Sequence, residues 1–389
     1  MNARALRTLF ALVAIAFFAI PVTLRAVGVT AKPFENRRLA EAPSLSQGWE
    51  AFDQATRFLT DRMPLREEAV RADSYISRHV FDTTPRYAGG GGAGTDRALP
   101  FAGAQQGDGA AAAAAGQATR VDEGKHGWLY LADEFTAACS PTVPVERAAA
   151  AWRRLVSIVR ASGRHAVVLV VPDKGSIYPE HVSLGHRVGA CASRGKQRLW
   201  DLLERTARSD DVIPLRRALL SRKRRGHGLL YSRTDSHWNQ RGATTLVEAA
   251  LRRVGGGVGV ARGEIVERGN VTFTGDLTTL LGDPQTETGP RVEVRRPAAA
   301  RRLPGRTAYV LDSFGDIVNP QLIPYLEQFR RVPWDTPPKR LLDAIAGVDT
   351  VIFQVVERDF TVLPSAGGEL SPAFLHGLRT RLAVAKKRR

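Results

Sequence analysis

Two short segments of this chain are apolar at nearly every position. Residues 166–171 read AVVLVV and residues 351–356 read VIFQVV. A run of about six such residues is typical of a central strand in a parallel sheet, which helices cover on both faces. These two segments therefore favour an α/β fold over an all-helical or all-β one.

The segments around these runs alternate between helical and extended patterns. Residues 121–131 predict a turn that enters a short strand, and further strands are predicted at 211–214 and 306–311. Helical spacing of apolar residues appears at 148–162, 194–207, 240–254 and 338–346. Alternation of this kind indicates a mostly parallel sheet covered by helices. We place this α/β domain at residues 119–365.

The N-terminus carries an apolar, uncharged stretch at residues 8–24, preceded by Arg4 and Arg7. As a helix it would span roughly 25 Å, slightly less than the ~30 Å hydrocarbon core. We interpret residues 1–30 as an uncleaved membrane anchor, with a cleaved signal or a core helix as alternatives. The flanking arginines favour an N-inside orientation, which would place the body of the protein outside the cytoplasm.

Three further segments differ in composition from the α/β domain. Residues 31–87 show amphipathic helical spacing and predict a helical extension. Residues 88–118 are dominated by Gly and Ala and predict a flexible linker. Residues 366–389 end in a basic cluster and predict a C-terminal tail.

Lys and Arg number 56 against 39 Asp and Glu, which gives a formal net charge of +17. The excess is spread along the chain, and no nucleic-acid-binding motif accompanies it, so we expect no nucleic-acid partner. The clusters at 222–225 and 386–389 predict a solvated loop and a frayed tail, or attraction to an anionic glycan or lipid surface. We expect neither a metal nor a cofactor.

The chain has two cysteines, Cys139 and Cys191. An oxidising location outside the cytoplasm would favour a disulfide between them. Two free buried thiols are the alternative.

Two local signals carry possible chemistry. Asp235 and His237 form a D-x-H motif before a predicted helix, and Ser313 follows the strand that ends at Leu311. A serine at a strand-to-helix turn lies at the carboxyl edge of the sheet, where open α/β sheets bind their ligands. It becomes a nucleophile when an imidazole, oriented by a carboxylate, accepts its proton. Backbone N–H groups at the start of the following helix could supply part of an oxyanion site.

Each signal also has a plainer interpretation. A D-x-H motif is often a loop hydrogen bond and is sometimes part of a metal site. A serine after a strand is commonly a turn residue or a helix cap. Spacing alone does not choose between these alternatives.

The runs DSHWNQRGA (235–243) and LDSF (311–314) resemble the SGNH-hydrolase-like domain of the alginate O-acetyltransferase (AlgX/AlgJ) family. Other segments agree in the same order along the chain. They are ENRRLAEAP (35–43), FLTDRMPLR (58–66), GKHGWLYL (124–131), VPDKGSIYPE (171–180), TGDL (274–277) and VVERDF (355–360). In one place the chain departs from the family's G-D-S turn, because Leu311 precedes Asp312 and Ser313.

The resemblance implies a three-layer αβα sandwich on the outer side of the membrane, either periplasmic or on the cell surface. It implies an O-acetyltransferase that acetylates a polysaccharide through an acetyl-serine on Ser313, with His237 as general base and Asp235 orienting it. It further implies a membrane-bound O-acyltransferase partner that supplies the acetyl group. A carbohydrate acetylesterase and a non-catalytic subunit of an export complex are the alternatives.

Three other residues are candidates for binding the glycan. Lys174 and Tyr178 follow a central strand, and Trp238 follows the histidine of the D-x-H motif. A structural loop is the alternative for Lys174 and Tyr178, and packing of the histidine loop is the alternative for Trp238.

Overall fold

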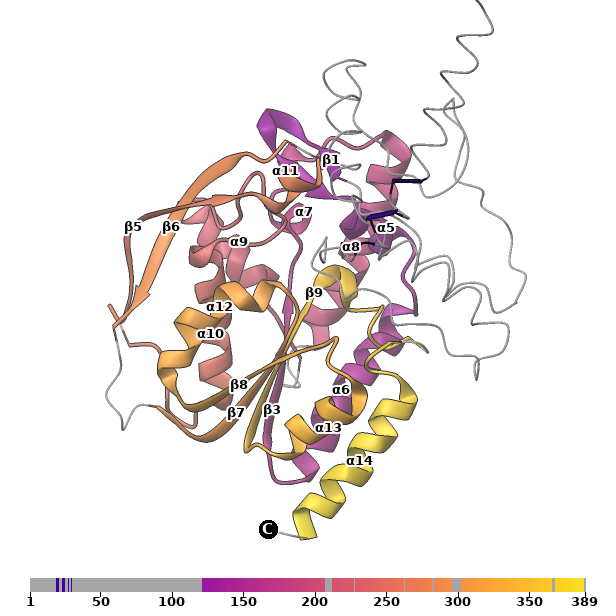
Figure 1. The fold of residues 1–389 in the computed structure, drawn as a ribbon, viewed down its shortest axis with the longest axis vertical. Helices are drawn as coiled ribbons and strands as arrows, with labels where there is room; N and C mark the ends of the chain where they lie inside the picture. Colours follow the sequence, from indigo (N-terminus) through magenta and orange to yellow (C-terminus); the bar gives the residue numbers. More distant parts are fainter. Residues whose placement is uncertain are drawn as a thin grey trace, which may run out of the picture. The chain divides into compact units, whose positions relative to one another are not determined.

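The computed structural model (Figure 1) describes residues 121–387 apart from 207–211, 227, 262, 282, 296–301 and 366–367, and a few positions between 19 and 29. Residues 120–279 and 284–389 form one compact unit. The second unit, Met1–Thr119 with Leu280–Asp283, lies largely outside the described residues.

The compact unit is built on a five-stranded sheet with the order β4-β3-β9-β7-β8. Every neighbouring pair in this sheet is parallel. The strands are β3 (His165–Val171), β4 (Val212–Pro214), β7 (Leu303–Leu311), β8 (Leu326–Pro333) and β9 (Thr350–Val356). The two apolar runs form β3 and β9, which pair along their whole length near the middle of the sheet. The predicted parallel α/β fold is confirmed.

Helices cover both faces of this sheet (Figure 1). One apolar core contains Val168 and Val170 of β3 with the inner sides of four helices. These are α6 (Val145–Ala161), α8 (His186–Thr206), α13 (Pro338–Ala346) and α14 (Pro372–Lys387). The other core contains Val167 and Leu169 of β3. The helices packed there are α9 (Arg216–Arg224), α10 (Gln240–Val254) and α12 (Phe314–Leu322). Because successive side chains of a strand point to opposite faces, β3 contributes to both cores, and the result is a three-layer sandwich.

Smaller elements complete the compact unit. The strands β1 (Val121–Glu123) and β2 (Leu129–Leu131) form one antiparallel pair, and β5 (Ile265–Thr274) and β6 (Thr286–Val294) form another. The short helices are α5 (Asp133–Cys139), α7 (Lys174–Ile177) and α11 (Asp276–Leu280). The 3-10 turns are η2 (Lys125–Gly127), η3 (Pro179–His181), η6 (Ile323–Tyr325) and η7 (Glu357–Asp359).

Two basic segments differ from their predicted form. The cluster at 222–225, predicted as a loop, lies at the end of helix α9. The predicted tail at 366–389 contains helix α14, whose residues Phe374, Leu378 and Leu382 are buried in the core. These residues recur every fourth position, so one face of α14 packs on the sandwich, while Arg379 and Arg381 are exposed.

Most predictions about the N-terminal part lie outside the described residues. This holds for nearly all of the membrane anchor at 1–30, and for the helical extension at 31–87 and the linker at 88–118. Within the part of the chain that the structure describes, no helix has both the length and the apolar character needed to cross a bilayer.

Cys139 and Cys191 form a disulfide with a Cα–Cα distance of 5.3 Å. The bond joins the end of α5 to α8, two helices that pack against each other near the carboxyl edge of the sheet. The pairing agrees with the prediction from the sequence.

If α14 belongs to the core, truncating its inner face should cost stability. We expect Leu378→Ala to lower the free energy of unfolding by about 2–5 kcal/mol, because the Leu378 side chain is fully buried and its truncation leaves a cavity in the core. Val384→Ala, on the same helix but 44% exposed, is the matched control and should change it by less than about 0.5 kcal/mol. Urea titration of both variants measures the difference, and equal losses would contradict the packing of α14.

Candidate active site

Ser313 lies in the turn between β7 and α12, at the carboxyl edge of the sheet. The preceding residue fixes this turn to the neighbouring strand β9. The carboxylate of Asp312 accepts hydrogen bonds from the backbone N–H of Val356 (2.7 Å) and from the amide of Gln354 (2.6 Å). These bonds fix the position of the Ser313 turn relative to β9.

Leu311, which stands where the family's G-D-S turn has glycine, is 1% exposed and ends β7 inside the core. The turn does not need a glycine there. The position that does is Gly315, because a Cβ on it would lie 2.5 Å from both the side-chain oxygen of Gln354 and a methyl carbon of Leu311. The backbone of the turn therefore approaches Gln354 and Leu311 most closely at Gly315.

Asp235, His237 and Ser313 form a continuous hydrogen-bonded chain. Nδ1 of His237 lies 2.7 Å from Oδ1 of Asp235, and Nε2 lies 2.8 Å from Oγ of Ser313. The side chains of His237 and Asp235 are only 12% and 17% exposed. A carboxylate that orients an imidazole, which in turn contacts a serine hydroxyl, is the arrangement that makes serine a nucleophile.

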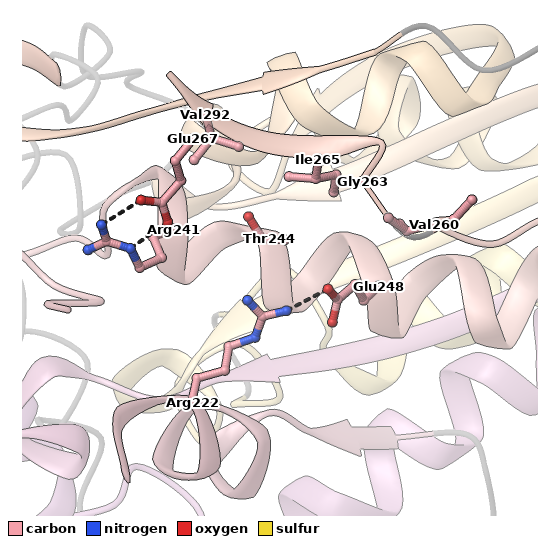
Figure 2. Close-up of a pocket in the computed structure, with 10 residues that line it drawn as sticks. Arg222, Arg241, Thr244, Glu248, Val260, Gly263, Ile265, Glu267 and Val292 are labelled. Carbon is pink, nitrogen blue, oxygen red and sulfur yellow. Dashed lines mark hydrogen bonds and ion pairs between the residues drawn. The ribbon is translucent and has the colours of Figure 1, made fainter. Parts of the chain in front are cut away.

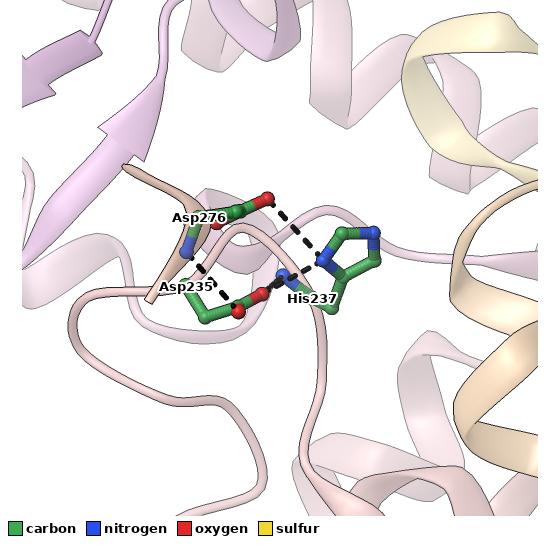
Figure 3. A group of neighbouring side chains, drawn as sticks. All are labelled: Asp235, His237 and Asp276. Atoms are coloured by element: carbon green, nitrogen blue, oxygen red, sulfur yellow. Dashed lines mark hydrogen bonds and ion pairs between the residues drawn. The ribbon is translucent and has the colours of Figure 1, made fainter. Parts of the chain in front are cut away.

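A second carboxylate also contacts this histidine, and no function was assigned to it from the sequence. Oδ2 of Asp276, at the start of α11, lies 3.4 Å from Nδ1 of His237 (Figure 3). Asp276 belongs to the TGDL segment, which the family resemblance singled out. Its local spacing could not place it beside a histidine 39 positions earlier.

The two carboxylates determine the protonation of His237. Burial lowers the pKa of His237, but hydrogen bonds and charge from Asp235 and Asp276 outweigh it and raise this pKa to about 10. The imidazolium is therefore the favoured form at neutral pH, and the Ser313 hydroxyl is its hydrogen-bond partner.

Lys174, a predicted glycan-binding residue, is 1% exposed and lies beneath the D-x-H loop. Its ammonium donates to the backbone carbonyls of Ser232 (3.0 Å), Arg233 (3.0 Å) and Asp235 (2.7 Å). Burial lowers the pKa of Lys174 to about 8, so it is mainly charged at neutral pH. This prediction is corrected, because Lys174 holds the loop and has no surface to offer a sugar.

Tyr178 and Trp238 are also buried, at 3% and 1% exposure. The hydroxyl of Tyr178 accepts the N–H of Leu230 (2.9 Å), and the indole of Trp238 donates to the carbonyl of Phe314 (3.0 Å). Both predictions of glycan contact are corrected. The bond from Trp238 ties the histidine loop directly to the turn that carries Ser313.

The hairpin β5–β6 braces the D-x-H loop from outside. The carboxylate of Glu287, on β6, accepts the N–H of Arg233 and the N–H of Thr234, both at 3.0 Å. A Cβ on Gly275 would lie 2.3 Å from the carbonyl of Thr234, so the start of α11 packs tightly against the loop. The loop is therefore held on two sides.

Buried ion pairs join the carboxyl ends of β3 and β9. Lys196 lies 3.1 Å from Glu134 and 3.6 Å from Glu357, and Arg358 pairs with Asp173. Glu357 also accepts the backbone N–H of Asp173 at 2.9 Å. These contacts fix the segment after β3, from which α7 carries its lysine under the loop.

The N–H groups expected to form an oxyanion site are partly occupied. At the start of α12, the N–H of Phe314 donates to Oδ1 of Asp312 (3.0 Å), and the N–H of Gly315 donates to its carbonyl (3.0 Å). The prediction is corrected for these two donors, which stabilise the turn itself.

A cavity of about 260 Å³ lies between α9, α10 and the hairpin (Figure 2). Its two arginines are each paired with an acid. Arg222 lies 2.5 Å from Glu248, and Arg241 lies 2.6 Å from Glu267. The positive charge of Arg222 is therefore balanced locally.

Among the described residues, Asp235, His237 and Asp276 have ligand-type atoms within 4.8 Å of one another, a spacing that could surround a cation. The hydrogen bonds of these side chains to one another and to Ser236 and Ser313 account for their closeness. The geometry is that of a hydrogen-bonded proton-transfer site.

A parallel α/β sheet that carries a hydrogen-bonded serine, histidine and aspartate at its carboxyl edge defines the class of this protein, an SGNH hydrolase-like domain. The family described as SGNH hydrolase-like domain, acetyltransferase AlgX, matches residues 121–320, just over half of the chain. The chain belongs to this AlgX/AlgJ family of acetyltransferases, as its sequence motifs predicted.

The chain spans about half the length of the curated relative that it matches. The probable alginate O-acetylase AlgJ of Pseudomonas aeruginosa is 31% identical over 214 residues, which span 51% of this chain and 52% of the relative. The O-acetyltransferase domain of Pseudomonas putida AlgJ is 19% identical with a TM-score of 0.47, covering 68% of this chain and 99% of that one. Pseudomonas aeruginosa AlgX is 14% identical with a TM-score of 0.45, covering 68% and 66%.

If Lys174 holds the D-x-H loop, its removal should destabilise the protein and disable the site. We expect Lys174→Met to lower the free energy of unfolding by about 2–4 kcal/mol, because three carbonyl oxygens lose their buried donor. Lys339→Met is the matched control. Lys339 is an exposed residue of α13, so its loss should change the free energy of unfolding by less than about 0.5 kcal/mol. Urea titration compares the two, and an equal effect would contradict the role of Lys174.

Proposed function

We propose that this chain transfers an acetyl group to a hydroxyl of a polysaccharide, through an acetyl-serine intermediate on Ser313. The observation that carries this proposal is the hydrogen-bonded chain from Asp235 through His237 to Ser313, with contacts of 2.7 and 2.8 Å. Membership of an acetyltransferase family supports the acetyl group as the cargo.

In the first step, Oγ of Ser313 attacks the carbonyl carbon of the acetyl donor. Nε2 of His237, in the neutral form of the imidazole, accepts the serine proton, while Asp235 holds Nδ1–H and stabilises the imidazolium that forms. The bond from the carbonyl carbon to the donor group then breaks, and the imidazolium returns its proton to that leaving group. The product is acetyl-Ser313 with a neutral imidazole.

In the second step, a sugar hydroxyl takes the place of the donor. His237 accepts its proton as the oxygen attacks acetyl-Ser313, and the imidazolium then returns a proton to the departing Oγ. The free serine is restored and the sugar carries the acetyl ester. Water in place of the sugar would give an acetylesterase with the same residues, so the acceptor alone separates the two activities.

The acceptor, location and donor are parts of the same proposal. A relative named as an alginate O-acetylase supports a polysaccharide acceptor. The apolar stretch at residues 8–24 supports a single-pass anchor with the catalytic domain outside the cytoplasm. The family resemblance implies that a membrane-bound O-acyltransferase is the partner that delivers the acetyl group.

The first test is loss of the serine. We expect Ser313→Ala to reduce hydrolysis of a chromogenic acetyl ester by at least about a thousandfold, because the acyl acceptor is gone. Ser193→Ala, which removes an exposed hydroxyl on α8, should retain activity. Trapped acetyl on a peptide containing Ser313, seen by mass spectrometry, would identify the intermediate. Full activity of Ser313→Ala would refute the proposal.

Candidate acceptors separate transfer from hydrolysis. The full chain is incubated with an acetyl ester and with alginate or other oligosaccharides, and the sugars are analysed by mass spectrometry. A gain of one acetyl group that requires Ser313 supports the transferase. Ester turnover without acetylation of any acceptor would identify an esterase.

A further inference from the structure

We propose that Asp276 is a positioning residue for His237, so that the base at this site is held by a pair of carboxylates, Asp235 and Asp276. This inference rests on the proposed function of His237 and Ser313. It gives a role to the TGDL segment, which the mechanism above leaves unused.

The contacts of Asp276 are concentrated on the D-x-H motif. Its Oδ1 accepts the N–H of Ser236 (2.6 Å), its Oδ2 accepts the Ser236 hydroxyl (2.5 Å), and Oδ2 lies 3.4 Å from Nδ1 of His237. Its own N–H donates to Oδ2 of Asp235 at 3.3 Å. Asp276 therefore contacts all three residues of the motif, as Figure 3 shows for Asp235 and His237.

The two carboxylates lie at different distances from Nδ1 of His237 and therefore act on it differently. Nδ1 of His237 carries a single proton, and Asp235 at 2.7 Å is its nearer acceptor. Asp276, at 3.4 Å, acts on the ring mainly through its charge and through its hold on Ser236. The backbone N–H of His237 also donates to Asp235 at 2.8 Å, so Asp235 holds both the ring and the backbone of His237.

Charge at Asp276 persists under working conditions. Burial raises the pKa of Asp276, but the hydrogen bonds and charge of His237 and Ser236 outweigh it and lower this pKa to about 2. The acidic side chains that face the ring are Asp235 and Asp276, with Asp312 from the Ser313 turn close enough to interact. Lys174 contributes an opposing positive charge behind Asp235.

A permanent second charge has a consequence for the reaction. Proton transfer from Ser313 converts the imidazole into an imidazolium, and two adjacent carboxylates stabilise that cation more than one does. The same charges keep the resting imidazole protonated up to a higher pH. Below its pKa, His237 cannot accept the serine proton, so activity should fall as the pH falls from an alkaline optimum.

Removing the charge of Asp276 while keeping its shape tests this role. We expect Asp276→Asn to move the acidic limb of the pH–rate profile for ester hydrolysis about one to three pH units lower, because one carboxylate near the ring is lost. Glu287→Gln is the matched control, since Glu287 braces the same loop through Arg233 and Thr234. Its acidic limb should stay within about 0.3 units of the wild-type limb, since it lies outside the contacts of the ring.

A second readout does not depend on catalysis. In a Ser313→Ala background, the rate at which diethyl pyrocarbonate modifies His237 in the full chain, followed by peptide mass spectrometry, reports the neutral imidazole at each pH. Asp276→Asn should lower the midpoint by the same amount as in the rate profile. An unchanged midpoint, or an equal shift in Glu287→Gln, would overturn the proposal.

The two readouts keep the proposals distinct. If Ser313→Ala retained esterase activity, the proposed function would fail, while modification of His237 would still decide the role of Asp276. A shift in the rate profile without a shift in the modification midpoint would show that Asp276 acts on the loop alone, and it would also overturn the inference.

Discussion

The hydrogen bond between Nε2 of His237 and Oγ of Ser313 joins two loops that are 76 positions apart in the chain. Both loops are held in place by hydrogen bonds near the edge of the sheet. Asp312 fixes the serine turn to β9, and Trp238 bonds the histidine loop to Phe314. Proton transfer needs heavy atoms within hydrogen-bond reach, and this geometry depends on these anchors.

One further anchor, Lys174, is a buried charge, and its position has a physical reason. Loop carbonyls near an active site cannot all pair within strands or helices, and each one left unpaired in the interior is costly. The ammonium of Lys174 offers three donors and meets three such carbonyls at once. A neutral side chain could not supply as many. Its burial is offset by nearby acids, including Glu134, Asp235 and Asp276.

Much of the fold was predictable because its central strands and covering helices carry strong patterns. The runs that form β3 and β9, and the helices α10 and α13, lie where the sequence placed them. The hairpin β5–β6 was missed because its strands are largely exposed and have no apolar run. Helix α14 was missed because the basic residues at the end of the segment predicted a tail, although apolar residues recur there every fourth position. These elements gain their stability from packing, which a local pattern does not contain.

The site residues likewise fall into those that the sequence motifs could predict and those that only the structure could place. Asp235, His237 and Ser313 could be named because the resemblance assigns roles to motifs, whereas Asp276 needed coordinates to place it beside the ring. The errors at Lys174, Tyr178 and Trp238 have a common cause. Lysine and aromatic residues near a strand end suit both a sugar-binding surface and a buried loop anchor, and only burial separates the two. Since all three are buried, the proposed glycan acceptor would have to contact other side chains around Ser313.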